Sequence, residues 1–181
     1  MTFTFKPAFL AATLGFCGAA QADSAASFAQ MTPLLEGMKS IGEAEIMSGA
    51  IAACYLGTGN RAMLEELKAL DNWEVYEPSE GALAYTPFVA PNLIVTIYAD
   101  SAFCDVENTA LTITQMQEAV VTAFDKAGVF VELQEEDTGC YVALVEDWHD
   151  GTLVGRISSN GQDPVCVSDA AGANIRFEGF N

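Results

Sequence analysis

The sequence predicts an α+β protein: three N-terminal helices, then a mostly antiparallel sheet of about five strands with one further helix packed on it. Two observations support this class. Apolar residues recur at helical spacing through the first third of the chain, whereas short runs that alternate apolar and polar residues follow Trp73. Hydrophobic residues make up 51% of the 181 residues, so a packed core is expected rather than disorder.

Residues 1–22 have the pattern of a secretory signal peptide. Lys6 supplies the positive charge, an apolar run follows from Ala8 to Gly18, and Ala20-Gln21-Ala22 places small residues where the signal peptidase cuts. The apolar run is well short of the ~20 residues that a membrane-spanning helix needs. We therefore expect cleavage after Ala22, in preference to lipid attachment at Cys17.

The mature chain, 23–181, is expected to form a single soluble domain, with a helical part over about 31–72 and a sheet part over about 82–181. The signal peptide directs it to the periplasm or out of the cell, and no later apolar run is long enough to hold it in a membrane. Its environment is therefore oxidising, and its cysteines are expected to be paired.

Three segments of the N-terminal part have the spacing of helices. After a frayed leader over 23–30, Thr32 is expected to cap the first helix, with Pro33 at its first position. Residues 43–57 form the second helix. Asn60 caps a third, which runs to Leu70.

The helix on the sheet is expected between Thr114 and Gly128. The segment from Thr114 to Gln117 has the capping-box pattern, with Thr114 as N-cap and Gln117 at the third helical position. The side of this helix that faces the core would carry Met116, Val120 and Phe124.

The sheet is expected from alternating runs bounded by turn residues. These runs cover 83–88, 93–99, 140–146, 152–158 and 174–179, with 129–133 as a short additional run. The runs 140–146 and 152–158 would form a hairpin across the loop 147–151, where Asp150-Gly151 supplies the turn.

Four cysteines follow the signal peptide: Cys54, Cys104, Cys140 and Cys166. An even number in a secreted chain predicts two disulfides, with three connectivities open. We favour Cys140–Cys166, which flanks the predicted hairpin, and Cys54–Cys104, which would tie the helical part to the sheet. A zinc site is disfavoured, because the cysteines are not at ligand spacing and the chain has one histidine.

The chain is strongly acidic, with 25 Asp and Glu residues against seven Lys and Arg residues and a net charge of −18 at pH 7. Such a charge repels nucleic acid and anionic membranes, and it attracts a basic protein or a divalent cation. It would also arise as an adaptation for solubility or high salt, with no partner involved. Composition leaves both interpretations open.

No catalytic, cofactor-binding or metal-binding residue is predicted. His149 lies in an acidic loop, which favours the charged imidazolium over the neutral form that a general base needs. Glu146, Asp147 and Asp150 could hold a calcium ion, but they lack the alternating ligands of an EF-hand. The acidic run 135–137 is expected to be a solvated turn.

Three motifs carry a resemblance. They are Phe103-Cys104-Asp105-Val106, Gly139-Cys140 and Asn160-Gly161-Gln162-Asp163-Pro164-Val165-Cys166. They resemble a group of small secreted proteins of Gram-negative bacteria that have a signal peptide, two disulfides and no assigned activity. The resemblance implies secretion and paired cysteines, and it implies nothing about activity.

These observations favour a secreted, non-enzymatic protein with a binding or structural role, whose partner would be a basic protein. Two alternatives remain. A small carboxylate-based hydrolase would be recognised by two close, buried acids with raised pKa values. A calcium-binding module would use the acidic loop around Asp147.

Overall fold

The computed structural model describes residues 27–58, 67–79, 82–98, 103–148, 151–159, 166–167 and 169–180. The α+β class is confirmed, because helices pack on an antiparallel sheet of eight strands. The predicted signal peptide and its cleavage site lie outside the described residues.

Three helical elements have defined bounds within these ranges. They are η1, a 3-10 helix over Thr32–Lys39, and the α-helices α2 over Glu43–Gly57 and α4 over Ile113–Ala127. Among the helices that the structure describes, none is long and apolar enough to cross a membrane.

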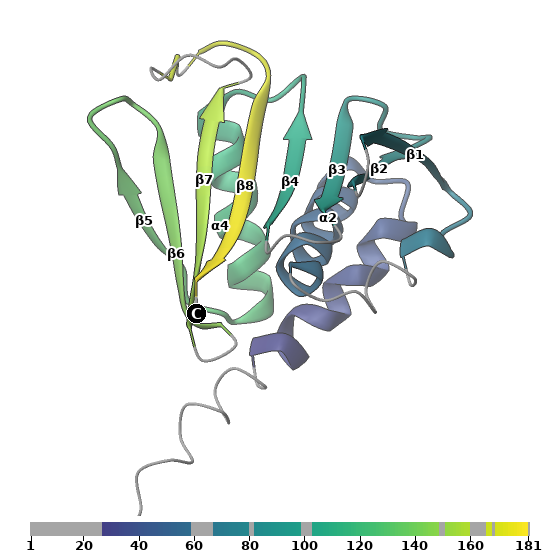
Figure 1. Ribbon diagram of the computed structural model, residues 1–181, viewed down its shortest axis with the longest axis horizontal. Coiled ribbons are helices and arrows are strands. Elements are labelled where there is room, and N and C mark those ends of the chain that lie inside the picture. The colour runs from purple at the N-terminus through teal and green to yellow at the C-terminus, as the bar shows by residue number, and fades with distance from the viewer. Residues whose placement is uncertain are drawn as a thin grey trace, which may run out of the picture.

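The strands form one sheet in which all neighbours are antiparallel, in the order β1-β2-β3-β4-β8-β7-β6-β5 (Figure 1). The last strand in the chain therefore lies between β4 and β7 and joins the two halves of the sheet. The bounds are β1 Trp73–Ser79, β2 Ala82–Pro87, β3 Leu93–Tyr98, β4 Phe103–Asn108, β5 Glu132–Glu135, β6 Tyr141–Trp148, β7 Gly151–Ser159 and β8 Ala173–Phe180.

The expectation of about five strands is wrong in number, because it omits β1 and β4. β1 contains Pro78 and two glutamates, and β4 contains Asp105 and Glu107, residue types that are depleted in strands. β1 is an edge strand, where proline is tolerated. In β4 the acids occupy the half-exposed face, where Asp105 pairs with Arg176.

Two strand boundaries also differ from the expectation. Val129 does not begin a strand, because its N–H donates to the Phe124 carbonyl and so completes the end of α4. β6 and β7 extend into the predicted 147–151 loop, with Trp148 paired to Gly151.

Of the predicted frayed leader, 27–30 are helical rather than frayed and continue into the fully buried Met31, whereas 23–26 lie outside the described residues. Thr32 does not cap a helix. Its Oγ1 donates to the Phe28 carbonyl at 2.8 Å, as a residue inside a helix does, and η1 continues directly from this turn. Of the third predicted helix, 60–66 lie outside the described residues, and Leu67 lies buried in a helical turn.

The prediction of a helix over 43–57 is confirmed by α2, which is buried from Ile46 to Gly57. α2 packs closely on η1 through Gly49. A Cβ at Gly49 would lie 2.6 Å from the backbone nitrogen of Met38, so only glycine fits at this contact without a shift of η1.

The capping box of α4 lies two residues earlier than predicted. Thr112, in an extended conformation, accepts from the Gln115 N–H at 3.3 Å, and the Gln115 side chain accepts from the Thr112 N–H at 3.0 Å. The rest of the prediction is confirmed: Gly128 ends α4 with a left-handed φ of 70°, and Met116, Val120 and Phe124 are fully buried.

The helices cover one face of the sheet. The strand residues that face them are almost completely buried, as Val95, Cys104 and Phe177 illustrate, and Phe177 contacts Phe124 of α4. The residues that alternate with them are half-buried or exposed. The molecule is therefore a helical layer on one side of a sheet whose other side has no helix over it in the described part of the chain.

Candidate functional site

The four cysteines pair as predicted. Cys54 of α2 is bonded to Cys104 of β4, with Cα atoms 5.5 Å apart, and Cys140 is bonded to Cys166, with Cα atoms 5.1 Å apart. The first bridge joins the helical layer to the sheet across 50 positions, and the second closes a loop of 26. All four residues are less than a tenth exposed, so they serve structure and leave no free thiol at these positions.

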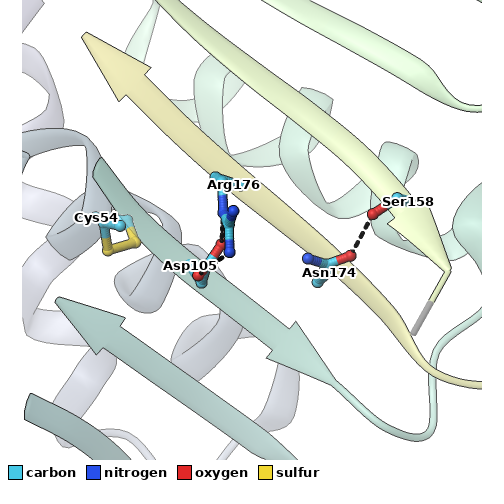
Figure 2. Close-up of polar contacts among 6 residues, drawn as sticks. Cys54, Asp105, Ser158, Asn174 and Arg176 are labelled. Atoms are coloured by element: carbon cyan, nitrogen blue, oxygen red, sulfur yellow. Dashed lines mark hydrogen bonds and ion pairs between the residues drawn. A yellow bond between two sulfur atoms is a disulfide. The ribbon is translucent and has the colours of Figure 1, made fainter. Parts of the chain in front are cut away.

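The side of the sheet away from the helices, here called the open face, carries the polar and aromatic side chains. Figure 2 views its centre, with the helices behind the strands. Its described residues on the central strands are Ile94, Thr96, Tyr98, Phe103, Asp105, Glu107, Val142, Leu144, Thr152, Val154, Arg156, Ser158, Asn174, Arg176 and Glu178.

Arg176 and Asp105 form the best-defined contact of the open face. The register places them opposite each other on β8 and β4. Arg176 donates from Nε to Asp105 Oδ1 at 2.7 Å and from Nη2 to Oδ2 at 3.0 Å (Figure 2). These hydrogen bonds raise the pKa of the Arg176 guanidinium above its usual value, against a smaller opposing effect of burial. The guanidinium thus holds the Asp105 side chain in a two-point fork.

Two aromatic rings extend this pair along the face. The guanidinium carbon of Arg176 lies 5.3 Å from the centre of the Phe103 ring, within the range of a cation–π contact. The rings of Phe103 and Tyr98 lie 4.3 Å apart. Both side chains are half-buried rather than buried. The centre of the open face thus combines two aromatic rings with an oriented arginine.

A second arginine lies beside the first. Arg156 of β7 is directly opposite Arg176 in the register, an arrangement that is unfavourable for like charges. Acids on the outer sides compensate: Asp105 pairs with Arg176, and Glu136 lies 3.6 Å from Nη2 of Arg156. The four charges run in the order minus, plus, plus, minus across the sheet.

The remaining centre of the face mixes apolar and polar contacts. Ser158 Oγ donates to Asn174 Oδ1 at 2.6 Å (Figure 2). Val142, Leu144 and Val154 on β6 and β7 are half-buried. The face offers apolar area, aromatic rings and hydrogen-bond donors together, which is chemistry for binding.

The residues considered for other chemistry are placed as follows. His149 and Asp150 lie outside the described residues; Glu146 and Asp147 end β6, but their side chains are not among those described. In the ranges that are described, no group of three or more His, Cys, Asp or Glu residues is arranged to hold a metal ion. The buried polar side chains there are Ser27, Ser48 and Thr58, so these ranges contain no buried carboxylate pair. In the predicted solvated turn, Asp137 is exposed and Glu136 is half-buried.

A pocket of about 240 Å³ lies between η1 and the helical turn that contains Leu67. Its walls are the apolar side chains of Leu35, Met38, Leu67 and Leu70 together with the polar residues Thr32, Glu36 and Lys39. The cation at its rim, Lys39, already contacts Glu36 at 3.1 Å, and both side chains are more than half exposed. The Thr32 hydroxyl donates to the Phe28 carbonyl, so the polar side chains of this pocket already contact groups of the neighbouring helical turns.

Sequence reasoning missed the main residues of the open face: Tyr98, Phe103, Asp105, Arg156 and Arg176. A signal for Arg176 was present, because the last strand was predicted with alternation and Arg176 falls on its polar side. No such signal marks its partner Asp105, because the segment from Phe103 contains two acids and a cysteine and does not have the pattern of a strand.

Comparisons with known proteins add no relative. No protein-family model, no curated protein and no solved structure matches this chain significantly.

Proposed function

We propose that this is a secreted, non-enzymatic binding protein that engages a basic protein partner through the open face. The main support for this proposal is the composition of the open face. Arg176, Phe103 and Tyr98 form a fixed cluster at its centre, and arginine and tyrosine are among the residue types that dominate binding energy at protein interfaces.

The charge of the surface supports a basic partner. Asp105 and Glu136 compensate the two arginines, and the face carries further acids in Glu107 and Glu178. The chain as a whole has a net charge of −18. A cationic partner would be steered toward such a protein, whereas a second copy would be repelled at low salt.

Secretion is supported by the two disulfides, which persist in oxidising compartments and are rare in the cytosol. The pattern of residues 1–22 points to the same destination. The two together support a periplasmic or extracellular site of action.

The test is affinity capture from native periplasmic extract at low and high salt, with the full oxidised protein and two variants. Phe103→Ala removes the central ring of the open face. Phe130→Ala removes a ring that is 78% exposed and lies just before the edge strand β5, four strands from β4 in the order of the sheet, and is the matched control. We expect a basic protein that binds the wild type and Phe130→Ala at low salt and is lost with Phe103→Ala or at high salt. Equal capture by the two variants would contradict the proposal.

A further inference from the structure

β1 is one of the two edges of the sheet, and it is the less protected one. An edge strand presents backbone N–H and C=O groups that can pair with another chain. The opposite edge, β5, is only four residues long, and three of these residues are polar: Glu132, Gln134 and Glu135. β1 is seven residues long.

The backbone groups that β1 directs outward can be identified. In an antiparallel pair, residues alternate between those that bond to the neighbouring strand and those that do not. The Asn72 carbonyl accepts from the Phe88 N–H at 3.1 Å, so Asn72 faces β2. By alternation Glu74 and Tyr76 also face β2. Trp73 and Val75 therefore direct their N–H and C=O groups away from the sheet.

The partner of Trp73 agrees with this assignment. The register pairs Trp73 with Pro87, which has no N–H to donate, as suits a position that makes no bond between β1 and β2. The pairing becomes irregular between Tyr76 and Ser79, so the regular outer edge covers Trp73 to Tyr76.

Exposed apolar side chains gather on this hairpin. Val75 and Tyr76 point to opposite faces of β1 and are 38% and 43% exposed. Phe88 and Val89, which follow β2, are 64% and 48% exposed. These are four of the seven exposed large hydrophobic residues in the part of the chain that the structure describes. This hairpin therefore exposes more apolar side chains than any other described segment, and an added strand could cover part of them.

The charges of β1 indicate what would pair with it. Glu74 and Glu77 are exposed, and Asp71 lies just before the strand. On a strand added beside β1, side chains next to Val75 would favour apolar residues, and those next to Glu74 would favour lysine or arginine. A second copy of this chain carries the same net charge of −18 and would be repelled at low salt.

We infer that the outer edge of β1 receives an extended segment of the partner in which apolar and basic residues alternate, by strand addition at Trp73 and Val75. The inference rests on the proposed function, since it places one segment of the same basic partner. It adds backbone recognition at the end of the sheet to side-chain recognition on the open face.

The test titrates the full oxidised protein with a peptide of alternating valine and lysine, as long as β1, and follows amide hydrogen exchange by NMR. We expect exchange to slow at Val75 and Trp73, and a valine–glutamate peptide to have no effect. Slowed exchange at Leu133 and Glu135 of β5 instead would overturn the inference. Absence of binding, or protection of Val75 that grows with protein concentration in the absence of peptide, would also overturn it.

Val75→Pro removes an outward N–H without removing a bond of the sheet, and it should weaken peptide binding about tenfold, the loss expected for one hydrogen bond. Glu135→Pro is the matched control, because the 2.8 Å bond from the Glu136 N–H to Cys140 leaves Glu135 facing outward on β5. Equal effects of the two variants would contradict the inference. The peptide experiment and the capture experiment are independent of each other. If capture depends on Phe103 but the peptide does not protect Val75, strand addition alone is refuted. If the peptide protects Val75 but capture does not depend on Phe103, the proposed function alone is refuted.

Discussion

Arg176 of β8 holds Asp105 of β4 with two hydrogen bonds, between residues that are 71 positions apart in the chain. The pair lies where the last strand joins the two halves of the sheet. Its side chains are 46% and 14% exposed, so solvent screens the attraction only in part.

The coupling between these two residues is the first prediction. In a double-mutant cycle of Asp105→Asn and Arg176→Gln, we expect an interaction free energy of about 1 kcal/mol, in the range of a partly exposed, forked pair. Urea unfolding of the four proteins measures it. Additive single variants would show that the contact contributes nothing to the join between β4 and β8.

The second prediction concerns the contact between α2 and η1. In a free helix, replacing glycine by alanine stabilises by about 1 kcal/mol. At Gly49 we expect the opposite sign, a loss of about 1–3 kcal/mol, because the new Cβ would collide with the Met38 backbone. Ala44→Gly, at an exposed position of the same helix, calibrates helix propensity. A Gly49→Ala variant with raised thermal stability would refute the close contact.

The third prediction separates the two candidate caps of α4. Thr112→Ala should cost about 1 kcal/mol, since it removes the side-chain acceptor for the Gln115 N–H. Thr114→Ala, at an exposed position, should change the free energy of unfolding by less than about 0.5 kcal/mol. A larger loss of stability in Thr114→Ala than in Thr112→Ala would instead support Thr114 as the cap, as predicted from the sequence.

The fourth prediction concerns alkaline pH. Tyr55 is fully buried, and this burial raises the pKa of its phenol above the usual 10.0, against a smaller effect of its 2.9 Å hydrogen bond with Ser27. The unfolded chain therefore loses this proton first as the pH rises. Stability is complete below about pH 10 and falls above it.

Urea unfolding across this range should show a steeper loss for the wild type than for Tyr55→Phe. Tyr76→Phe, at an exposed phenol, is the control and should keep the wild-type slope. Equal slopes for the wild type and Tyr55→Phe would contradict this account of Tyr55.

Local patterns carried most of the correct predictions. α2 and the end of α4 at Gly128 follow from spacing and turn chemistry within one segment. The cysteine pairing was also accessible, because Cys140 and Cys166 flank one hairpin. The cap of α4 shows the limit of such patterns: Thr112 and Thr114 both have a glutamine three positions later, and only backbone geometry selects between them.

The open face could not be predicted in this way, because its contacts are not local. Aspartate is unfavourable in a strand, and only the β4–β8 register, which places Arg176 opposite Asp105, explains its presence in β4. The burial of Met31 is similar. It follows a segment, 23–30, that is mostly small and polar, and nothing in this local pattern indicates that the chain packs into the core at Met31. In both cases tertiary contacts outweigh local preference.

The most direct test of the central claim is hydroxyl-radical footprinting of the protein alone and with the captured basic partner. The account predicts that Tyr98 and Phe103 become shielded at low salt and return to their free reactivity at high salt, while Phe130 is unchanged. Shielding of Phe130 with no change at Tyr98 and Phe103 would contradict the claim that the open face is the binding surface.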